Sequence, residues 1–402
     1  MPHAFTFLEA LPYHLRRGAL LLALSGLGPA AWGQSYGPVS TYPTASTGSQ
    51  AYGLAMGDLN ADGRLDIVTV NNYNNSTSSV GVLLGQAGGT FGAVTSYPLG
   101  ASTNGYYWTV ALGDVTGDGQ PDIVTARNLA AGYVVVLPGQ GGGSFGAPTT
   151  YPTGPNGAPY GVALGDLNND GRLDIVTTTS ADQVGVLLGQ AGGFAASSSY
   201  PAASNGSPRG LALGDVNGDG RLDAVTANDN GHNVTVLLGQ ATGFGPASTY
   251  STGPNSFPVS PTLGDVNGDG RLDIVTANGG TSTAGVLLGQ AGGGFQAVST
   301  YATGVGSHPF KIALGDVNGD GRPDLVSGNA SAPGVSLLLG QAGGFAPFSA
   351  LPATAAIYAY DLALGDANHD GRPDIIVLNT ASNTANVLLN TGTFTPLAAA
   401  PL

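Results

Sequence analysis

The sequence predicts an all-β fold, a seven-bladed β-propeller of four-stranded antiparallel blades. Three observations lead to this prediction. A short acidic, glycine-rich stretch such as GDVNGDGRLD (214–223) recurs seven times along the chain. Each copy lies in a unit that contains four short apolar runs separated by turn residues. Glu and Lys, which commonly form the solvent-exposed faces of helices, are almost absent, since the 402 residues include one of each.

The repeat length supports seven blades. The first Asp of each acidic stretch stands at 58, 114, 166, 215, 265, 316 and 366, with spacings of 56, 52, 49, 50, 51 and 50 residues. Radial closure of seven four-stranded units removes the sheet edges that would otherwise be exposed.

Each unit reads as strands A to D in the same order. In the first unit, strand A is YGLAMGD (52–58) and strand B is the β-branched run LDIVTV (65–70). The acidic stretch joins A to B. A polar loop leads to strand C, VGVLLGQ (80–86), and a Gly-rich turn leads to strand D in FGAVTSYP (91–98).

The two ends of the repeat array predict how the ring closes. An extra D-like segment, YGPVSTYP (36–43), precedes the first A strand, and a poorer copy, FTPLAAAP (394–401), ends the chain. We expect the N-terminal copy to complete the last blade. Closure by the C-terminal copy is the alternative.

The repeat resembles the FG-GAP, or VCBS-type, repeats of the integrin α-subunit propeller and of many secreted bacterial proteins. FGAP stands at 145–148, with the related FGA at 91–93 and FGP at 244–246. The resemblance extends over nearly the whole chain after residue 33. It implies a propeller whose A–B loops bind calcium on one face. It does not imply one function, because the family includes adhesion receptors, lectins and scaffolds.

The acidic stretch has the pattern D-x-N-x-D-G-x-x-D, which is typical of a calcium loop. Calcium takes six to eight oxygen ligands, and the Gly at position 6 permits the sharp turn. Position 12, the last ligand of an ordinary helix-flanked calcium loop, is never acidic here, so position 9 must supply the final carboxylate. The alternative is that Asp-Gly serves only as a hairpin turn. We therefore predict up to seven structural Ca²⁺ ions, held by side chains at positions 1, 3, 5 and 9 and by the carbonyl of position 7.

The predicted metal ligands are Asp58, Asn60, Asp62, Arg64 and Asp66; Asp114, Thr116, Asp118, Gln120 and Asp122; Asp166, Asn168, Asp170, Arg172 and Asp174; Asp215, Asn217, Asp219, Arg221 and Asp223; Asp265, Asn267, Asp269, Arg271 and Asp273; Asp316, Asn318, Asp320, Arg322 and Asp324; Asp366, Asn368, Asp370, Arg372 and Asp374. We expect the second site to be the weakest, because Thr116 offers only a hydroxyl.

Charge and composition exclude some classes of partner and of metal site. The formal net charge of −14 argues against nucleic acid, whose phosphates require Lys and Arg. The chain has no Cys, which excludes disulfides and thiolate metal sites.

Two arginines followed by GALLLALSGLG (18–28) and small residues predict a secretory signal peptide over 1–33, with one propeller domain over 34–402. A disordered N-terminus is the alternative. We expect a monomer that is secreted, extracellular or at the cell surface, with no membrane span.

A candidate ligand surface lies where the A strands begin. Six residues before each first Asp stand Tyr52, Trp108, Tyr160, Arg209, Val259, Phe310 and Tyr360. The sequence NGYYWTV (105–111) adds Tyr106 and Tyr107. The aromatic members Tyr52, Tyr106, Tyr107, Trp108, Tyr160 and Tyr360 are candidate ligand-binding residues. Alternatively, they plug the mouth of the central channel or pack between blades.

Three functions are compatible with these features. The first is a non-catalytic adhesion or interaction module for an extracellular protein or glycan. The second is a lectin that depends on calcium or is stabilised by it, with sugar sites on the loop face or between blades. The third is a polysaccharide-active enzyme. It is disfavoured, because no triad or carboxylate pair stands outside the calcium loops. We predict no catalytic residue.

Overall fold

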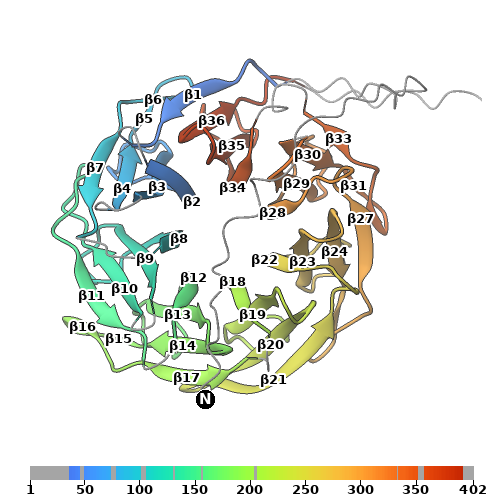
Figure 1. Ribbon diagram of the computed structural model, residues 1–402, viewed down its shortest axis with the longest axis horizontal. Helices are drawn as coiled ribbons and strands as arrows, with labels where there is room; N and C mark the ends of the chain where they lie inside the picture. The colour runs from blue at the N-terminus through green and yellow to red at the C-terminus, as the bar shows by residue number, and fades with distance from the viewer. Residues whose placement is uncertain are drawn as a thin grey trace, which may run out of the picture.

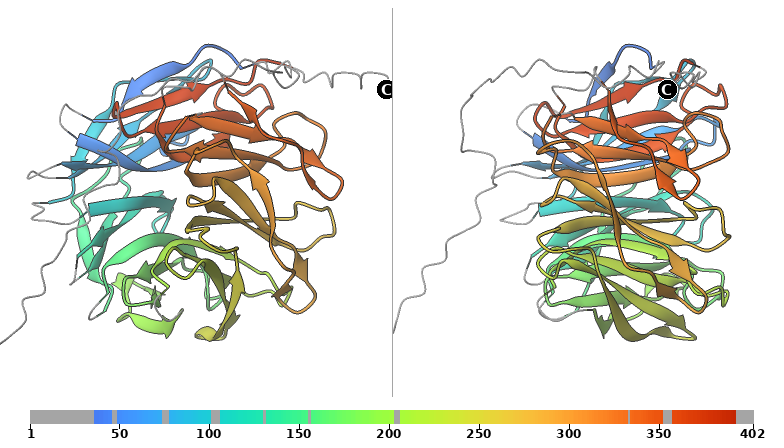
Figure 2. Two further views of the ribbon diagram at one scale, coloured as in Figure 1. Left: turned by 45° about the vertical axis from the view of Figure 1, so that its right-hand side comes forward. Right: turned by 90° about the vertical axis from the view of Figure 1, so that its right-hand side faces the viewer.

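The computed structural model of the chain describes residues 36–45, 49–73, 78–100, 106–129, 132–154, 157–202, 206–332, 334–351 and 357–392. These residues form seven four-stranded antiparallel sheets arranged around a central channel, which confirms the predicted seven-bladed β-propeller (Figure 1). Seen from the side, the ring is a thick disc (Figure 2). The predicted signal peptide lies outside the described residues. The described part of the chain has no helix with the length and apolarity needed to cross a bilayer.

Every blade runs from the channel outward as strands A, B, C and D. Blades 1 to 3 are β2 (Ser49–Gly57), β3 (Asp66–Tyr73), β4 (Ser79–Leu83) and β7 (Thr95–Pro98); β8 (Tyr106–Gly113), β9 (Asp122–Asn128), β10 (Tyr133–Leu137) and β11 (Thr149–Pro152); β12 (Pro159–Gly165), β13 (Asp174–Thr179), β14 (Gln183–Leu187) and β17 (Ser198–Pro201). Blades 4 and 5 are β18 (Pro208–Gly214), β19 (Asp223–Asn228), β20 (Asn233–Gln240) and β21 (Gly243–Ser251); β22 (Pro258–Gly264), β23 (Asp273–Asn278), β24 (Thr283–Leu287) and β27 (Ser299–Ala302).

Blades 6 and 7 complete the ring. They are β28 (Pro309–Gly315), β29 (Asp324–Asn329), β30 (Val335–Leu338) and β33 (Ser349–Ala350); β34 (Ala359–Gly365), β35 (Asp374–Asn379), β36 (Thr384–Leu388) and β1 (Ser40–Pro43). In four blades the C–D turn forms a small hairpin, namely β5 (Gly85–Gln86) with β6 (Thr90–Phe91), β15 (Gly189–Gln190) with β16 (Gly193–Phe194), β25 (Gly289–Gln290) with β26 (Gly294–Phe295), and β31 (Gly340–Gln341) with β32 (Gly344–Phe345).

The N-terminal segment closes the ring, as the sequence predicts. Strand β1 pairs antiparallel with β36 and so supplies strand D of blade 7. Thr41 Oγ1 donates a hydrogen bond to Asn386 Oδ1 at 3.1 Å across this pair. Tyr36 bridges Asn390 just as Phe145 bridges Gly139 in blade 2, so Tyr36 takes the place of the Phe of the FG sequence. The C-terminal copy lies outside the described residues.

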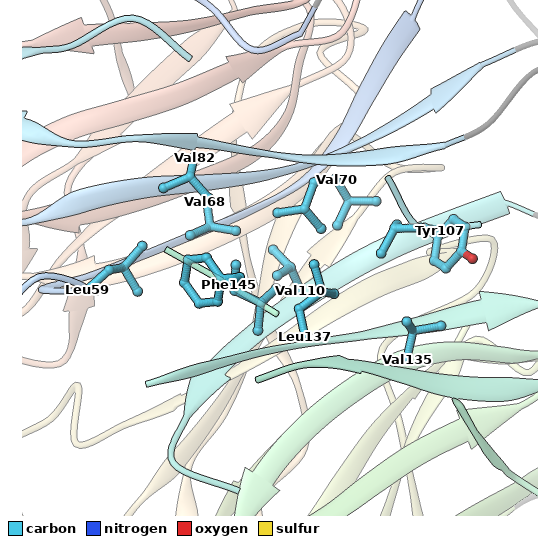
Figure 3. Packing of buried hydrophobic residues seen from close by; sticks show 12 residues of the cluster. Leu59, Val68, Val70, Val82, Tyr107, Val110, Val135, Leu137 and Phe145 are labelled. Atoms are coloured by element: carbon cyan, nitrogen blue, oxygen red, sulfur yellow. The ribbon is translucent and has the colours of Figure 1, made fainter. Parts of the chain in front are cut away.

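The apolar core is divided among the seams between neighbouring blades. The B and C strands are buried on both faces, so each blade packs against a neighbour on either side. Val68, Val70 and Val82 of blade 1 meet Val110 and Leu137 of blade 2 in one such cluster (Figure 3). Equivalent clusters occupy the other six seams. Because each core lies between two blades, the first and last blades bury their remaining faces only when the ring closes.

A Tyr–Phe pair marks six of the seven seams. In each pair, the Tyr of one blade's D strand meets the Phe of the next blade's FG sequence edge to face, a favourable arrangement for aromatic rings. The ring centroids are 4.9 to 5.6 Å apart. The pairs are Tyr42–Phe91, Tyr97–Phe145, Tyr151–Phe194, Tyr200–Phe244, Tyr250–Phe295 and Tyr301–Phe345. The Phe of the FG sequence therefore serves to pack neighbouring blades against each other.

We expect Phe244→Ala to lower the free energy of unfolding by about 3–5 kcal/mol, since it empties a buried aromatic site against Tyr200. Phe244 is 5% exposed. Urea unfolding followed by tryptophan fluorescence and far-UV circular dichroism measures the change. The matched control is Tyr358→Ala, because Tyr358 is 50% exposed and its loss should cost less than about 1 kcal/mol. Equal losses in the two variants would contradict a seam role for Phe244.

Candidate functional site

The antiparallel topology gives the ring two unlike faces. The A–B loops and the C–D turns lie on one face, here called the acidic face. The B–C loops and the D–A loops lie on the other, here called the loop face. All 21 aspartates and six arginines of the repeated acidic stretch belong to the acidic face, a formal charge of −15. The two faces therefore suit different partners.

Each A–B loop is folded by its own side chains. In blade 4, Asp215 Oδ1 accepts the amides of Gly218 and Asp219 at 2.7 and 3.0 Å, and Oδ2 accepts the amide of Gly220 at 2.7 Å. Asn217 Nδ2 donates to Asp219 Oδ2 at 3.0 Å. Gly220 has a φ of 83°, which explains the Gly at position 6. Positions 1, 3 and 5 thus fold the turn through hydrogen bonds to backbone amides and to one another.

The position-9 carboxylate has a structural role that the sequence reasoning missed. Asp223 is fully buried, where Oδ2 accepts the amide of Val216 at 2.8 Å and Oδ1 accepts the amide of Gly239 at 2.6 Å. The same two contacts recur in every blade and fasten the A–B loop to the C–D turn. The signal was the GQ that ends the strand C run in six blades, where a Cβ at Gly239 would collide with the carbonyl oxygen of Leu222.

Burial controls the ionisation of these carboxyls. It raises the pKa of all seven position-9 aspartates above the ordinary value. For Asp324 the pKa rises to about 6. In the fourth loop the charges of Asp219 and Asp215 raise the pKa of Asp223 further. Three carboxylates therefore lie within electrostatic reach of one another in that loop.

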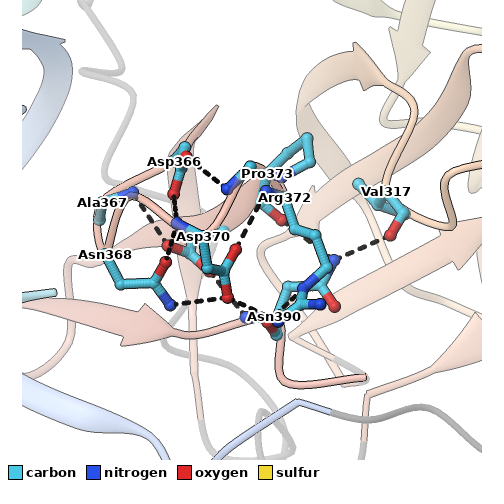
Figure 4. A network of polar contacts seen from close by, with 10 residues as sticks. Val317, Asp366, Ala367, Asn368, Asp370, Arg372, Pro373 and Asn390 are labelled. Atoms are coloured by element: carbon cyan, nitrogen blue, oxygen red, sulfur yellow. Dashed lines mark hydrogen bonds and ion pairs between the residues drawn. The ribbon is translucent and has the colours of Figure 1, made fainter. Parts of the chain in front are cut away.

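The position-7 arginines differ from loop to loop. In the last loop, Arg372 Nη2 pairs with Asp370 Oδ2 at 2.7 Å, and Arg372 Nε donates to the carbonyl oxygen of Asn390 at 3.2 Å (Figure 4). Arg64 pairs with Asp62 in the same way. The two arginine side chains are more than a third exposed, so solvent screens both pairs and they add little to stability.

The loops offer the donor atoms that calcium prefers. Aspartate, asparagine and carbonyl oxygens are hard ligands suited to Ca²⁺. Within the described ranges, however, no group of three or more His, Cys, Asp or Glu side chains forms a ready-made metal cluster. The carboxylates are instead directed at backbone amides. The donor chemistry fits calcium, and calcium binding stays a prediction.

On the loop face, every A strand carries a β-bulge, and it falls at the position six residues before the first Asp of the acidic stretch. The ladder register with strand B shifts in all seven blades, between Ala51 and Gly53, Tyr107 and Val110, Pro159 and Val162, Pro208 and Gly210, Pro258 and Pro261, Pro309 and Lys311, and Ala359 and Asp361. The skipped positions include Tyr52, Trp108, Tyr160, Arg209, Val259, Phe310 and Tyr360. Bulges re-aim side chains and are common at the rims of closed sheets.

Five aromatic rings form a continuous arc over four neighbouring blades. Phe310 of blade 6 contacts Tyr360 of blade 7, with ring centroids 4.4 Å apart. Tyr360 contacts Tyr52 of blade 1 at 5.6 Å, and Tyr52 contacts Trp108 of blade 2 at 4.8 Å. Trp108 and Tyr106 end the series at 5.6 Å. This set, here called the aromatic arc, follows the innermost strands β28, β34, β2 and β8 (Figure 1).

Comparison with known protein families shows which family the chain belongs to. Six overlapping stretches match the family described as FG-GAP-like repeat, at residues 58–125, 114–177, 173–226, 215–276, 265–327 and 316–377. The chain belongs to the FG-GAP-like repeat family. No curated protein matches its sequence.

Solved structures share the fold of this FG-GAP-like propeller at low sequence identity. BBS1N in complex with ARL6DN, in a mercury-soaked crystal, has a TM-score of 0.59 and 10% identity, covering 89% of this chain and 98% of that one. A lead-soaked crystal of the same complex has a TM-score of 0.56 and 11% identity, covering 89% and 97%. The periplasmic gluconolactonase PpgL of Pseudomonas aeruginosa has a TM-score of 0.55 and 17% identity, covering 76% and 85%. At these identities the likeness shows the fold alone.

The structure corrects one predicted ligand residue of the FG-GAP-like propeller. Tyr107 is 1% exposed and packs in the seam between blades 1 and 2 (Figure 3), so it is not available to a ligand. Its backbone amide and carbonyl are both bonded to the side chain of Asn72. Alternation along β8 places Tyr106 outward, where it is 44% exposed. Tyr160 stands at its own bulge on β12, beyond the aromatic arc.

Charged groups of the propeller's loop face occur as pairs near the channel mouth. Arg209 Nε lies 2.7 Å from Asp229 Oδ2, and Lys311 Nζ lies 3.7 Å from Asp361 Oδ1. Burial raises the pKa of Asp361, which also accepts the amide of Leu54 at 2.9 Å. The Lys311–Asp361 pair thereby connects blade 6 to blade 7 and blade 7 to blade 1.

Proposed function

We propose that this chain is a secreted, non-catalytic interaction module that binds an extracellular macromolecule with its loop face. The observation that carries the proposal is the bulge repeated at the channel mouth of all seven blades. A bulge costs ladder hydrogen bonds, so its use at one rim of every blade favours a role for the residues presented there.

The exposed apolar side chains support the same face. Among the described residues, the large hydrophobic side chains with the greatest exposure are Tyr106, Phe257, Val305 and Tyr358, at 44, 40, 99 and 50%. All four stand in D–A loops or at the start of an A strand. Phe257 also has a φ of 47°, an uncommon conformation for a bulky residue. Aromatic side chains dominate the energy of many interfaces.

Paired charges favour binding over catalysis. Of the three carboxylates on the described loop face, Asp229 and Asp361 are held by Arg209 and Lys311. Asp182 Oδ1 accepts the amide of Ser207 at 2.8 Å. General acid–base catalysis needs a titratable group within reach of a bound substrate and free to exchange a proton.

Calcium has a separate, structural part in this proposal. Side chains at positions 1, 3, 5 and 9 of each A–B loop would hold the ion, with the carbonyl of position 7. Bound Ca²⁺ would offset the formal charge of −15 that the loops place on the acidic face. In a chain without cysteine, it would stabilise the propeller where disulfides cannot.

The test is binding of the protein, in millimolar calcium, to a glycan array and to an array of purified extracellular proteins. Trp108→Ala should lower the affinity for a ligand of the loop face about 30-fold, the effect of losing a hot-spot residue that contributes about 2 kcal/mol. Val259→Ala, at the same bulge in blade 5, should change binding less than about twofold. Gln290→Ala, on the exposed acidic face, is the second control. Ligands that respond only to Gln290→Ala would place the interaction on the wrong face and overturn the proposal.

A further inference from the structure

The channel mouth has two unlike walls, and together they specify a ligand. We infer that the loop face binds a neutral saccharide, which stacks on the aromatic arc and hydrogen-bonds to the Arg209–Asp229 pair. This inference rests on the proposed function and names the chemistry of its ligand. It is built from the aromatic arc, the ion pair across the channel and the charge of the face.

The aromatic arc provides the stacking wall. Sugar rings present patches of C–H groups with partial positive charge, which pack on the negative faces of aromatic rings. Tyr106, Trp108, Tyr52 and Tyr360 are successive rings of the arc, with neighbouring centroids 4.8 to 5.6 Å apart. Tyr52 Oη donates its hydrogen bond to Gln50 Oε1 at 2.8 Å, which leaves the oxygen able to accept one from a sugar hydroxyl. The wall therefore combines apolar ring faces with hydroxyl groups.

The Arg209–Asp229 pair provides the polar wall. Arg209 is the second residue of β18 in blade 4, and Asp229 lies in the B–C loop of the same blade, with Nε and Oδ2 2.7 Å apart. The Arg209 side chain is 44% exposed. It occupies the bulge position of blade 4 that Tyr360 occupies in blade 7, so both side chains belong to the same rim of the channel. A guanidinium offers several donors in one plane and a carboxylate offers acceptors, the set that adjacent sugar hydroxyls require.

The charge of the face favours a neutral sugar over an acidic one. Described loop-face residues carry three acids, Asp182, Asp229 and Asp361, and three bases, Arg127, Arg209 and Lys311, a formal charge of zero. Two of the bases are already paired with acids. A polyanionic glycan or an acidic peptide would need an excess of basic charge, which this surface does not have. Hydroxyl groups need only the donors and acceptors described above.

The experiment uses the whole exported protein on an array of neutral, acidic and basic glycans, in 2 mM calcium at roughly physiological salt. Neutral hits are then titrated as free oligosaccharides by calorimetry. We expect Tyr106→Ala and Arg209→Gln each to weaken binding more than tenfold, and Trp108→Ala to weaken it further. Val259→Ala is the matched control and should change affinity less than twofold. Tyr106 is 44% exposed, so Tyr106→Ala should fold and tests the stacking wall even if Trp108→Ala fails to fold.

The outcomes separate the saccharide inference from the proposed function. Binding of neutral glycans that is insensitive to Tyr106→Ala and Arg209→Gln overturns the inference, as does binding restricted to acidic glycans. If no glycan binds, but a protein on the parallel array binds and is lost in Trp108→Ala, the inference fails and the interaction function stands. If nothing on either array binds the loop face, both fail.

Discussion

EDTA should lower the melting temperature of this protein by about 10 °C relative to 1 mM calcium. Extracellular calcium modules bind with dissociation constants of roughly 10⁻⁴–10⁻³ M, so a filled site at the tight end contributes about 1.4 kcal/mol at 1 mM calcium. Seven such loops would contribute about 10 kcal/mol, comparable to the stability of a whole domain. Differential scanning calorimetry with and without EDTA measures the shift.

Two controls make this result specific. Magnesium at the same concentration should restore much less of the melting temperature, because the ion is smaller and dehydrates reluctantly. Asp219→Asn should lower the calcium-dependent part of the shift more than Asp118→Asn, since the loop of Asp118 has Thr116 where the others have Asn. An identical melting curve in EDTA and in calcium would show that the acids act only through the backbone hydrogen bonds described above.

Deletion of residues 36–43 is expected to open the ring. It removes β1, so β36 becomes an unpaired edge from Thr384 to Val387. It also removes Tyr36 and Tyr42 from the cores of two seams. The combined loss is on the order of 5 kcal/mol, a large part of a typical folding free energy. We expect a much lower unfolding midpoint, measured by urea titration, and aggregation seen by size-exclusion chromatography, because exposed edges pair between molecules.

The matched variant deletes residues 393–402, which include the C-terminal copy at 394–401. We expect this variant to keep the unfolding midpoint within experimental error, because β1 already occupies the outer edge of β36. The reverse result, a stable protein without 36–43 and an unstable one without 393–402, would assign closure to the C-terminal copy instead.

Much of the fold could be predicted from sequence because each repeat carries its own turn and strand signals. Asp-Gly turns, β-branched B strands and the spacing of Asp215 from Asp265 predict blade number and strand order without tertiary information. The N-terminal closure was also predictable, since YGPVSTYP repeats the pattern of FGAVTSYP. These signals are local, and a propeller consists mostly of local pairings within a blade.

The site was less predictable, because it depends on contacts between blades. The sequence assigned Asp223 to metal alone, whereas the structure buries it between Val216 and Gly239. Tyr106, Tyr107 and Trp108 look equivalent in sequence, yet Tyr107 faces a seam. The contacts of Tyr52 with Trp108 and Tyr360 also join strands of different blades. No periodicity within one repeat carries this information.

The bulges also bear on how such a propeller can change its specificity. Each bulged position lies outside the strand register, so a substitution there alters the channel mouth without altering a cross-strand pair. The seven positions already hold residues as different as Trp108, Arg209 and Val259 on nearly identical strands. Tyr160, Arg209 and Val259 stand outside the aromatic arc, so these three positions can vary without loss of its ring contacts. A library randomised at these three positions should keep the unfolding midpoint of the parent.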